Sequence, residues 1–234
     1  MNSKICIITA RGGSKRIPRK NIKDFCGKPI IAYSIQVAKE SKLFDEIMVS
    51  TDDQEITDIS REFGATVPFL RSAKNSDDHS GTVDVLIEVL EEYKSRNKNF
   101  KHACCIYPTA PLLRVETLVA GWELLQKQEL DSVFPVLKFG FPIQRALRMK
   151  SNSLVSMFQP ENRTKRSQDL EPSYHDAGQF YFFHVGRFLE SKQLWTDKTA
   201  GIVLNELDAQ DIDNEEDWKI AEFKYEYRKK IMQS

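Results

Sequence analysis

The sequence predicts an α/β fold with a mostly parallel sheet, on three observations. Short apolar runs alternate with longer amphipathic segments, which is typical of consecutive βαβ units. Polar residues directly follow several of the apolar runs, at 11–20, 50–53 and 107–110. The length of 234 residues suits one large domain. Because ligands of such sheets bind beyond the carboxyl ends of the strands, these polar residues are the first candidates for a functional site.

The first four elements follow directly from the apolar pattern. Residues 4–10 (KICIITA) form a short apolar run and indicate a buried strand, and 29–41 indicate a helix with Pro29 in its first turn. Residues 46–53 (EIMVSTDD) indicate a second strand with a polar end. The helix predicted over 54–64 ends at a glycine.

The same alternation continues through the middle of the chain. We expect a strand over 65–70, a helix over 82–95 and a buried strand within 102–111. A helix over 115–128 and a strand over 131–139 follow. This order again indicates parallel strands connected by helices.

The pattern changes after residue 139. Residues 139–174 are polar and irregular, with short strands, turns and no long helix, so we expect an excursion that serves as a dimerisation arm or a lid. The chain returns through a strand over 179–185 and ends in a helix over 214–231, which is acidic at its start and basic at its end. We expect a single domain over 1–234 that contains this excursion.

The composition excludes several classes of protein. Lys+Arg and Asp+Glu both number 34, and zero net charge argues against broad nucleic-acid binding. No apolar run approaches the roughly 20 residues that span a bilayer, and the N-terminal run is too short for a signal peptide. We therefore expect a cytoplasmic protein that binds neither nucleic acid nor membrane. The four cysteines match no zinc or disulfide spacing and are expected to be inert thiols: Cys6, Cys26, Cys104 and Cys105.

The charge is nevertheless unevenly placed. The stretch ITARGGSKRIPRKN at 8–21 holds five cations and a Gly-Gly pair directly after the first strand. It matches neither the P-loop nor the dinucleotide fingerprint. Glycines let backbone N–H groups approach an anion, and Arg11, Lys15 and Lys20 can supply the charge that a triphosphate needs. The alternative is a solvated basic turn.

An acidic segment, ELDAQDIDNEEDW at 206–218, balances these cations. Asp211 and Asp213 flank one residue, so both carboxylates point to one face of an extended chain. Two hard oxygen ligands suit Mg²⁺, which takes few protein carboxylates and completes its shell with water and substrate phosphates. The alternative is that Asp213 or Asn214 caps the last helix.

The order of motifs resembles the CMP-sialic acid synthetase family, the cytidylyltransferases that activate nine-carbon acidic sugars. The motifs are ARGGSKRIPRKN at 10–21, VSTDD at 49–53, LRSAKNSDD at 70–78, YPTAP at 107–111, RSQDLEPSYHDAGQFY at 166–181 and DIDNEEDW at 211–218. The resemblance covers essentially the whole chain. It implies a Rossmann-like sheet of the nucleotide-diphospho-sugar transferase (GT-A-like) type. It also implies attack of a 2-keto sugar acid hydroxyl on the α-phosphorus of CTP, with loss of diphosphate.

The resemblance also assigns the nucleotide and metal residues. It implies that CTP is held by Ala10, Arg11, Gly12, Gly13, Ser14, Lys20, Asn21 and Arg71, of which Arg11, Lys20 and Asn21 act in catalysis. It places the magnesium ion at Asp211 and Asp213. The alternative for Arg71 is a surface arginine that caps the end of a strand.

The sugar half departs from the sialic acid pattern. YPTAP at 107–111 replaces a Gln-Pro-Thr-Ser-Pro motif, and DAGQ at 176–179 replaces Asn-Gly-Ala. These segments resemble the members of the family that act on pseudaminic acid, whose more apolar tail suits a pocket with fewer polar groups. The implied sugar residues are Tyr107, Gln144, Arg166, Gln168, Tyr174, Asp176 and Gln179.

Two alternative functions remain open at this point. One is CMP transfer to N-acetylneuraminic or legionaminic acid, and the other is an inactive module that senses nucleotide or binds a partner. The pairing of the basic loop with Asp211 and Asp213 argues against the inactive module. Apolar residues within 139–174 also predict a homodimer, because monomers rarely expose such a patch.

Overall fold

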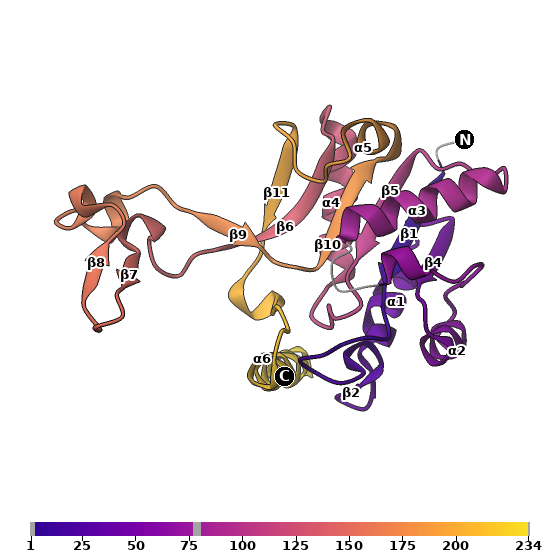
Figure 1. Ribbon diagram of the computed structural model, residues 1–234, viewed down its shortest axis with the longest axis horizontal. Helices are drawn as coiled ribbons and strands as arrows, with labels where there is room; N and C mark the ends of the chain where they lie inside the picture. The colour runs from indigo at the N-terminus through magenta and orange to yellow at the C-terminus, as the bar shows by residue number, and fades with distance from the viewer. Residues whose placement is uncertain (1–2, 77–80, 234) are drawn as a thin grey trace.

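A computed structural model describes residues 3–76 and 81–233, so the last two residues of the motif at 70–78 lie outside the described part. Its centre is a seven-stranded sheet with the order β11-β6-β10-β5-β1-β4, and β9 pairs with β6 (Figure 1). The strands are β1 (Lys4–Thr9), β4 (Glu46–Ser50), β5 (His102–Ile106), β6 (Ser132–Lys138), β9 (Tyr174–Asp176), β10 (Phe180–His184) and β11 (Thr199–Val203).

The strand directions are mixed around a parallel centre. β1 pairs in parallel with β4 and with β5, and β11 pairs in parallel with β6. β10 lies antiparallel between β5 and β6, and β9 is antiparallel to β6. The expected α/β fold with a mostly parallel sheet is confirmed, and β10 is the strand that joins its two parallel parts.

Helices cover both faces of the sheet, and the C-terminal helix packs beside it in a small core of its own. The helices are α1 (Ile30–Glu40), α2 (Gln54–Glu62), α3 (Thr82–Ser95), α4 (Val115–Lys127), α5 (Val185–Ser191) and α6 (Glu215–Gln233). Within β1, Cys6 and Ile8 face a core shared with α1, α2 and α4, whereas Ile5 and Ile7 face a core shared with α3 and α5. This alternation is the period-2 geometry of a strand buried on both sides.

One predicted strand is wrong. Residues 65–70 form no strand, and only Thr66 makes an isolated bridge, to Met48 at the edge of the sheet. Pro68 lacks an N–H group, so the segment cannot continue a ladder of hydrogen bonds past that position. The elements that were not predicted include the short helix α5, the strand β11 and a two-stranded hairpin of β2 (Asp24–Phe25) and β3 (Lys28–Pro29).

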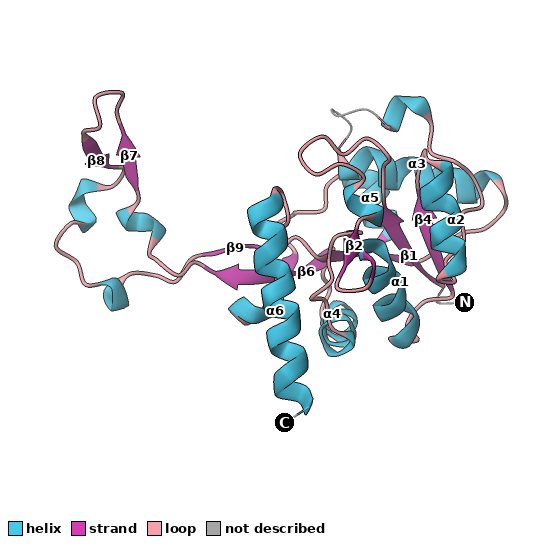
Figure 2. Ribbon diagram, turned by 90° about the horizontal axis from the view of Figure 1, so that it is seen from below, coloured by secondary structure: helices cyan, strands magenta, loops and turns pink. Residues whose placement is uncertain are grey.

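The segment 139–174 leaves the body of the protein as an arm. Figures 1 and 2 show it projecting from the ends of β6 and β9, with the hairpin of β7 (Leu147–Met149) and β8 (Val155–Met157) at its far end. Large apolar side chains are exposed along it, including Phe141 at 61% and Met149 at 75%. Among the described residues, no helix is both long enough and apolar enough to cross a membrane.

The cysteines lie largely inside the core. Cys6, Cys104 and Cys105 are fully buried, and burial raises the pKa of all three thiols. Cys26 is partly buried, and burial raises the pKa of its thiol to about 11. The four thiols are therefore protonated at neutral pH and lack the thiolate character of reactive cysteines.

Candidate functional site

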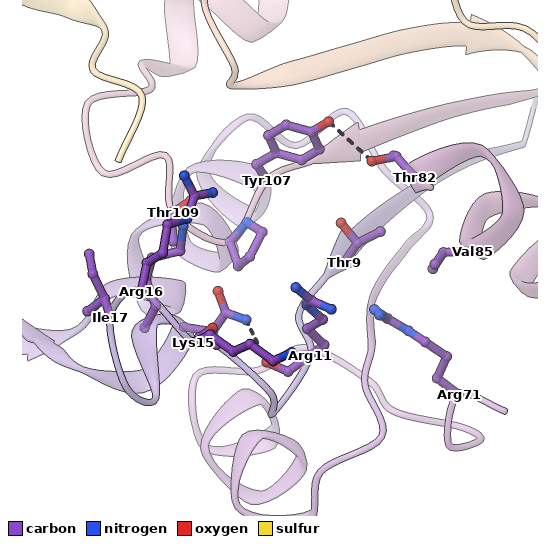
Figure 3. A pocket seen from close by; sticks show the side chains of 14 residues that line it. Thr9, Arg11, Lys15, Arg16, Ile17, Arg71, Thr82, Val85, Tyr107 and Thr109 are labelled. Carbon is purple, nitrogen blue, oxygen red and sulfur yellow. Dashed lines mark hydrogen bonds between the residues drawn. The ribbon is translucent and has the colours of Figure 1, made fainter. Parts of the chain in front are cut away.

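A cavity of about 250 Å³ lies beyond the carboxyl ends of β1 and β5. Figure 3 shows Arg11 and Arg71 approaching this space from two sides, with Tyr107 on a third. Five of the residues predicted to hold CTP line it, namely Arg11, Ser14, Lys20, Asn21 and Arg71. Lys15 and Arg16 add two further cations, and no carboxylate is among the described lining residues. The cavity therefore suits a multiply charged anion.

The basic loop that forms one wall is held at both ends. At its far end Arg19 adopts a left-handed conformation (φ 54°). Its guanidinium makes two hydrogen bonds to Asp53, of 2.5 and 2.9 Å, and a third to Glu55. Asp53 also caps α2 by accepting a hydrogen bond from the N–H of Ile56. The bonds from Arg19 hold the pKa of Asp53 down to about 2. We call this arrangement the Arg19–Asp53 clamp.

The near end of the loop packs against the same corner. The N–H of Gly12 donates to Oδ1 of Asp52 at 3.0 Å. A Cβ atom at Gly12 would lie 2.7 Å from Oδ2 of Asp53, so only glycine fits without a shift. The expectation that the glycines offer backbone donors to an anion therefore does not hold for Gly12 in this structure. Ala10 is buried and bonds to Ser50, and Gly13 faces open space.

Two further residues fix the walls of the cavity. Asn21 is buried and donates from Nδ2 to the carbonyl of Arg11 at 2.9 Å, which closes the loop on itself. Arg71 is 8% exposed, and its Nε donates to the hydroxyl of Ser50. Burial lowers the pKa of Arg71, and Asp52 and Glu88 counteract that effect. Arg71 is thus not a surface residue, but it does cap the end of β4, because Nη2 also donates to the carbonyl of Ser50. A buried guanidinium that lines a cavity favours an anionic ligand.

The acidic segment meets the basic loop directly. Nζ of Lys20 donates to the carbonyl of Ile212 at 2.6 Å, and Arg16 forms a 2.7 Å ion pair with Asp213. Burial lowers the pKa of Lys20, and the carboxylates of Asp213 and Asp211 oppose that shift. Segments almost 200 residues apart in the sequence thus lie together, as the charge asymmetry predicted.

The carboxylate of Asp213 is not used to cap the last helix. Oδ1 of Asn214 accepts the N–H groups of Glu216 and Asp217, so Asn214 is the cap. Burial and then the neighbouring Asp213 raise the pKa of Asp211, so the two carboxylates lie close enough to interact. Among the described residues no group of three His, Cys, Asp or Glu could hold a metal ion. Two carboxylates fit a Mg²⁺ ion that takes its other ligands from water and phosphate.

Three of the predicted sugar residues lie near these groups. Tyr107 lines the cavity, and its hydroxyl contacts that of Thr82 at 3.2 Å. Asp176 accepts hydrogen bonds from the hydroxyl of Tyr181 and, at 2.9 Å, from the N–H of Gly178. Gln179 is buried, and its Nε2 donates to the carbonyl of Asp208 at 2.7 Å. Asp176 and Nε2 of Gln179 are thus engaged within the protein, whereas Oε1 of Gln179 is buried without a hydrogen-bond partner among the described residues.

The other predicted sugar residues belong to the arm or its base. Arg166 pairs with Asp169 at 2.8 Å, and Gln144 donates to the carbonyl of Glu171. Gln168 lines a separate cavity within the arm, and Tyr174 lies in β9, 46% exposed. Figures 1 and 2 show the arm directed away from β1 and β5. A single chain therefore does not bring Gln144, Arg166 or Gln168 to the cavity.

Sequence reasoning missed the roles of Arg16 and Arg19. Both were counted among the loop cations, but Arg16 pairs with Asp213 and Arg19 with Asp53. One signal was present, because the polar end of the second strand, at 50–53, was already a candidate. The sequence therefore identified the segment that contains Asp53, but not that Asp53 would pair with Arg19.

Comparison with known proteins identifies the family. A sequence model of the cytidylyltransferases matches residues 5–219. The chain belongs to the cytidylyltransferase family. This cytidylyltransferase is 42% identical over 221 residues to the pseudaminic acid cytidylyltransferase of Campylobacter jejuni, a match that covers 94% of this chain and 95% of the relative. It is 30% identical to the CMP-N,N'-diacetyllegionaminic acid synthase of Legionella pneumophila, over 93% of this chain and 94% of the relative.

A solved structure supports the fold of this cytidylyltransferase. CMP:2-keto-3-deoxy-manno-octonic acid synthetase, solved with CTP, superposes with a TM-score of 0.70 at 15% identity. The match covers 97% of this chain and 99% of that one. At this identity the similarity concerns the fold, which is the Rossmann-like nucleotidyltransferase type that the motifs implied.

Proposed function

We propose that this cytidylyltransferase joins CTP to pseudaminic acid, forming CMP-pseudaminic acid and diphosphate. The observation that carries the proposal is the cation-lined cavity facing the Asp211–Asp213 pair, in a chain 42% identical to a pseudaminic acid cytidylyltransferase. In the reaction the anomeric hydroxyl oxygen of the sugar bonds to the α-phosphorus. The bond between that phosphorus and the bridging oxygen breaks, its electron pair leaves with the diphosphate, and the hydroxyl proton passes to solvent.

Arg11, Ser14, Lys20 and Asn21 would hold the triphosphate along the loop, and Arg71 would meet it from the opposite wall. Negative charge moves onto the diphosphate as the bond breaks. Cations fixed beforehand around the leaving group stabilise that charge more in the transition state than in the ground state. The hydrogen bond from Asn21 to the carbonyl of Arg11 supports this role, because it keeps the loop closed around the phosphates.

Asp211 and Asp213 would hold a magnesium ion. When bound, the ion would neutralise phosphate charge and help to orient the triphosphate. The protein's own contribution would be to pack Asp211 against Gly178 and to pair Asp213 with Arg16. Lys20, bonded to the carbonyl between the two aspartates, would connect the ion to the phosphate loop.

The sugar would lie beyond Tyr107, near Tyr174 and Asp176. We propose that Gln144, Arg166 and Gln168 reach the sugar from the arm of a second chain in a homodimer. Two features support this: the arm is directed away from its own cavity (Figure 2), and it exposes Phe141 and Met149. Apolar side chains on a projecting arm are typical of a surface covered by a partner.

The test is diphosphate release from CTP with Mg²⁺ and a panel of sugar acids: pseudaminic, legionaminic and N-acetylneuraminic. We expect turnover with pseudaminic acid and none in excess chelator. Faster turnover with legionaminic acid would move the assignment to that substrate, which the Legionella relative makes the main alternative. Tight CTP binding without turnover on any sugar would indicate an inactive nucleotide-sensing module.

A further inference from the structure

Arg16 belongs to two sites at once. It lines the cavity proposed for the triphosphate, and its Nη2 forms a 2.7 Å ion pair with Oδ1 of Asp213, one of the two carboxylates proposed for the metal. The other cation that reaches this segment behaves differently. Lys20 donates to the main-chain carbonyl of Ile212 and leaves the carboxylate oxygens to other ligands.

The backbone beside Arg16 is fixed, whereas its side chain is exposed. The next residue, Ile17, is 1% exposed and packs with Phe25 and Trp218 in a small core beneath the loop. The side chain of Arg16 is 67% exposed, and that of Asp213 is 45% exposed. The guanidinium can therefore turn from Asp213 toward the cavity by side-chain rotation alone, while the loop stays in place.

A guanidinium on Oδ1 of Asp213 and a divalent cation on the same oxygen compete, because both need the same lone pairs and like charges repel. We infer that Arg16 is a metal-coupled nucleotide residue. A divalent ion at Asp213 displaces it, and the released guanidinium then binds the triphosphate. The inference rests on the proposed function, since it uses the same metal pair and the same phosphate cavity.

This exchange has opposite effects on the two ligands. Without the guanidinium, the metal meets no competitor at Asp213 and binds more tightly. Without it, the triphosphate loses one charge-assisted contact and binds more weakly. If Arg16 only connected the loop to the acidic segment, its substitution would not strengthen metal binding and weaken triphosphate binding at the same time.

The chain offers a matched control in Lys23. Its Nζ pairs with Glu215 at 2.8 Å, close to the acidic segment, but Lys23 does not line the cavity. Lys23→Met removes the same charge from the same neighbourhood as Arg16→Met. The difference between the two variants therefore separates direct competition from a general change in the electric field.

The first experiment measures Mn²⁺ binding to the free protein, by the electron paramagnetic resonance signal of unbound Mn²⁺. Exposed ion pairs contribute little, so we expect Arg16→Met to bind Mn²⁺ about two- to fivefold more tightly than Lys23→Met. The second experiment titrates CTP calorimetrically at saturating Mn²⁺. A hydrogen bond to a charged group predicts that Arg16→Met binds CTP about tenfold more weakly, with Lys23→Met close to the wild type.

Equal Mn²⁺ affinities of the two variants would overturn the exchange, as would wild-type CTP affinity in Arg16→Met. If Arg16→Met changed only the melting temperature, the role of Arg16 would be structural. Failure of the proposed function looks different. In that case the wild type binds no CTP in the presence of Mn²⁺, or binds it without turnover on any sugar, while the Mn²⁺ titrations still report whether Arg16 competes at Asp213.

Discussion

Replacing Asp53 tests how the phosphate loop is held. Asp53 makes two separable contributions, because one oxygen caps α2 and both oxygens accept bonds from Arg19. Asp53→Ala removes the cap and the ion pair. Asp53→Asn removes the charge, and asparagine remains a good helix cap. The two variants therefore distinguish the cap from the Arg19–Asp53 clamp.

The structure allows the free-energy contributions of the ion pair and of the helix cap to be estimated. The pKa of Asp53 falls from an ordinary 3.8 to about 2, mainly through the bonds from Arg19. At 1.36 kcal/mol per pKa unit this corresponds to about 2 kcal/mol, and the exposure of the Arg19 side chain reduces it to about 1 kcal/mol. Loss of an N-cap adds about 1 kcal/mol. We expect Asp53→Ala to unfold at a temperature about 4–8 °C lower and Asp53→Asn at about 2–4 °C lower.

The assay is thermal denaturation followed by circular dichroism from pH 7 to pH 2, with Glu55→Gln as control. Glu55 is 65% exposed, so its loss should change little. A depressed carboxyl pKa stabilises the fold above its unfolded value of about 4, and this contribution disappears as the pH falls toward 2. The gap between wild type and Asp53→Asn should close over that range. Wild-type stability of Asp53→Asn, or a gap independent of pH, would refute the clamp.

Three further outcomes are expected. Arg11→Ala should lower kcat with pseudaminic acid about a hundredfold, because a contact to the leaving diphosphate strengthens in the transition state; an effect on KM for CTP alone would contradict this. Gly12→Ala should raise KM for CTP while the fold remains, since its Cβ would lie 2.7 Å from a carboxylate oxygen of Asp53 and must displace the loop. Light scattering at micromolar concentration should give a dimer mass, and Phe141→Glu in the arm should shift it toward monomer.

The order of elements was predictable because local patterns determine it. The helix over 82–95 was predicted to the residue, and the first strand to within one residue. The prediction of a strand over 65–70 was wrong because Pro68 has no N–H group. The apolar residues of this run can still pack against the core, but the run cannot complete a ladder of hydrogen bonds. The antiparallel direction of β10 could not be predicted, since it depends on where the chain re-enters the sheet after the arm.

That cations of the basic loop would line one cavity was also predictable. These cations are contiguous in the sequence, so a strand followed by a glycine-rich basic loop already gathers them. The contacts that position the loop were not predictable. The Arg19–Asp53 clamp and the Arg16–Asp213 pair join residues 34 and almost 200 positions apart, and only the sheet order brings them together.

The sugar half divides between the body and the arm for a topological reason. Asp176 and Gln179 follow the return of the chain into the sheet, and their polar atoms hold Tyr181, Gly178 and the backbone beside the aspartate pair. Arg166 precedes that return and lies on the arm, paired with Asp169. A sequence motif that runs from 166 to 181 thus crosses a structural boundary. In the homodimer that we propose, Arg166 would meet the sugar in the site of a second chain, so substrate choice and dimer formation would depend on the same arm.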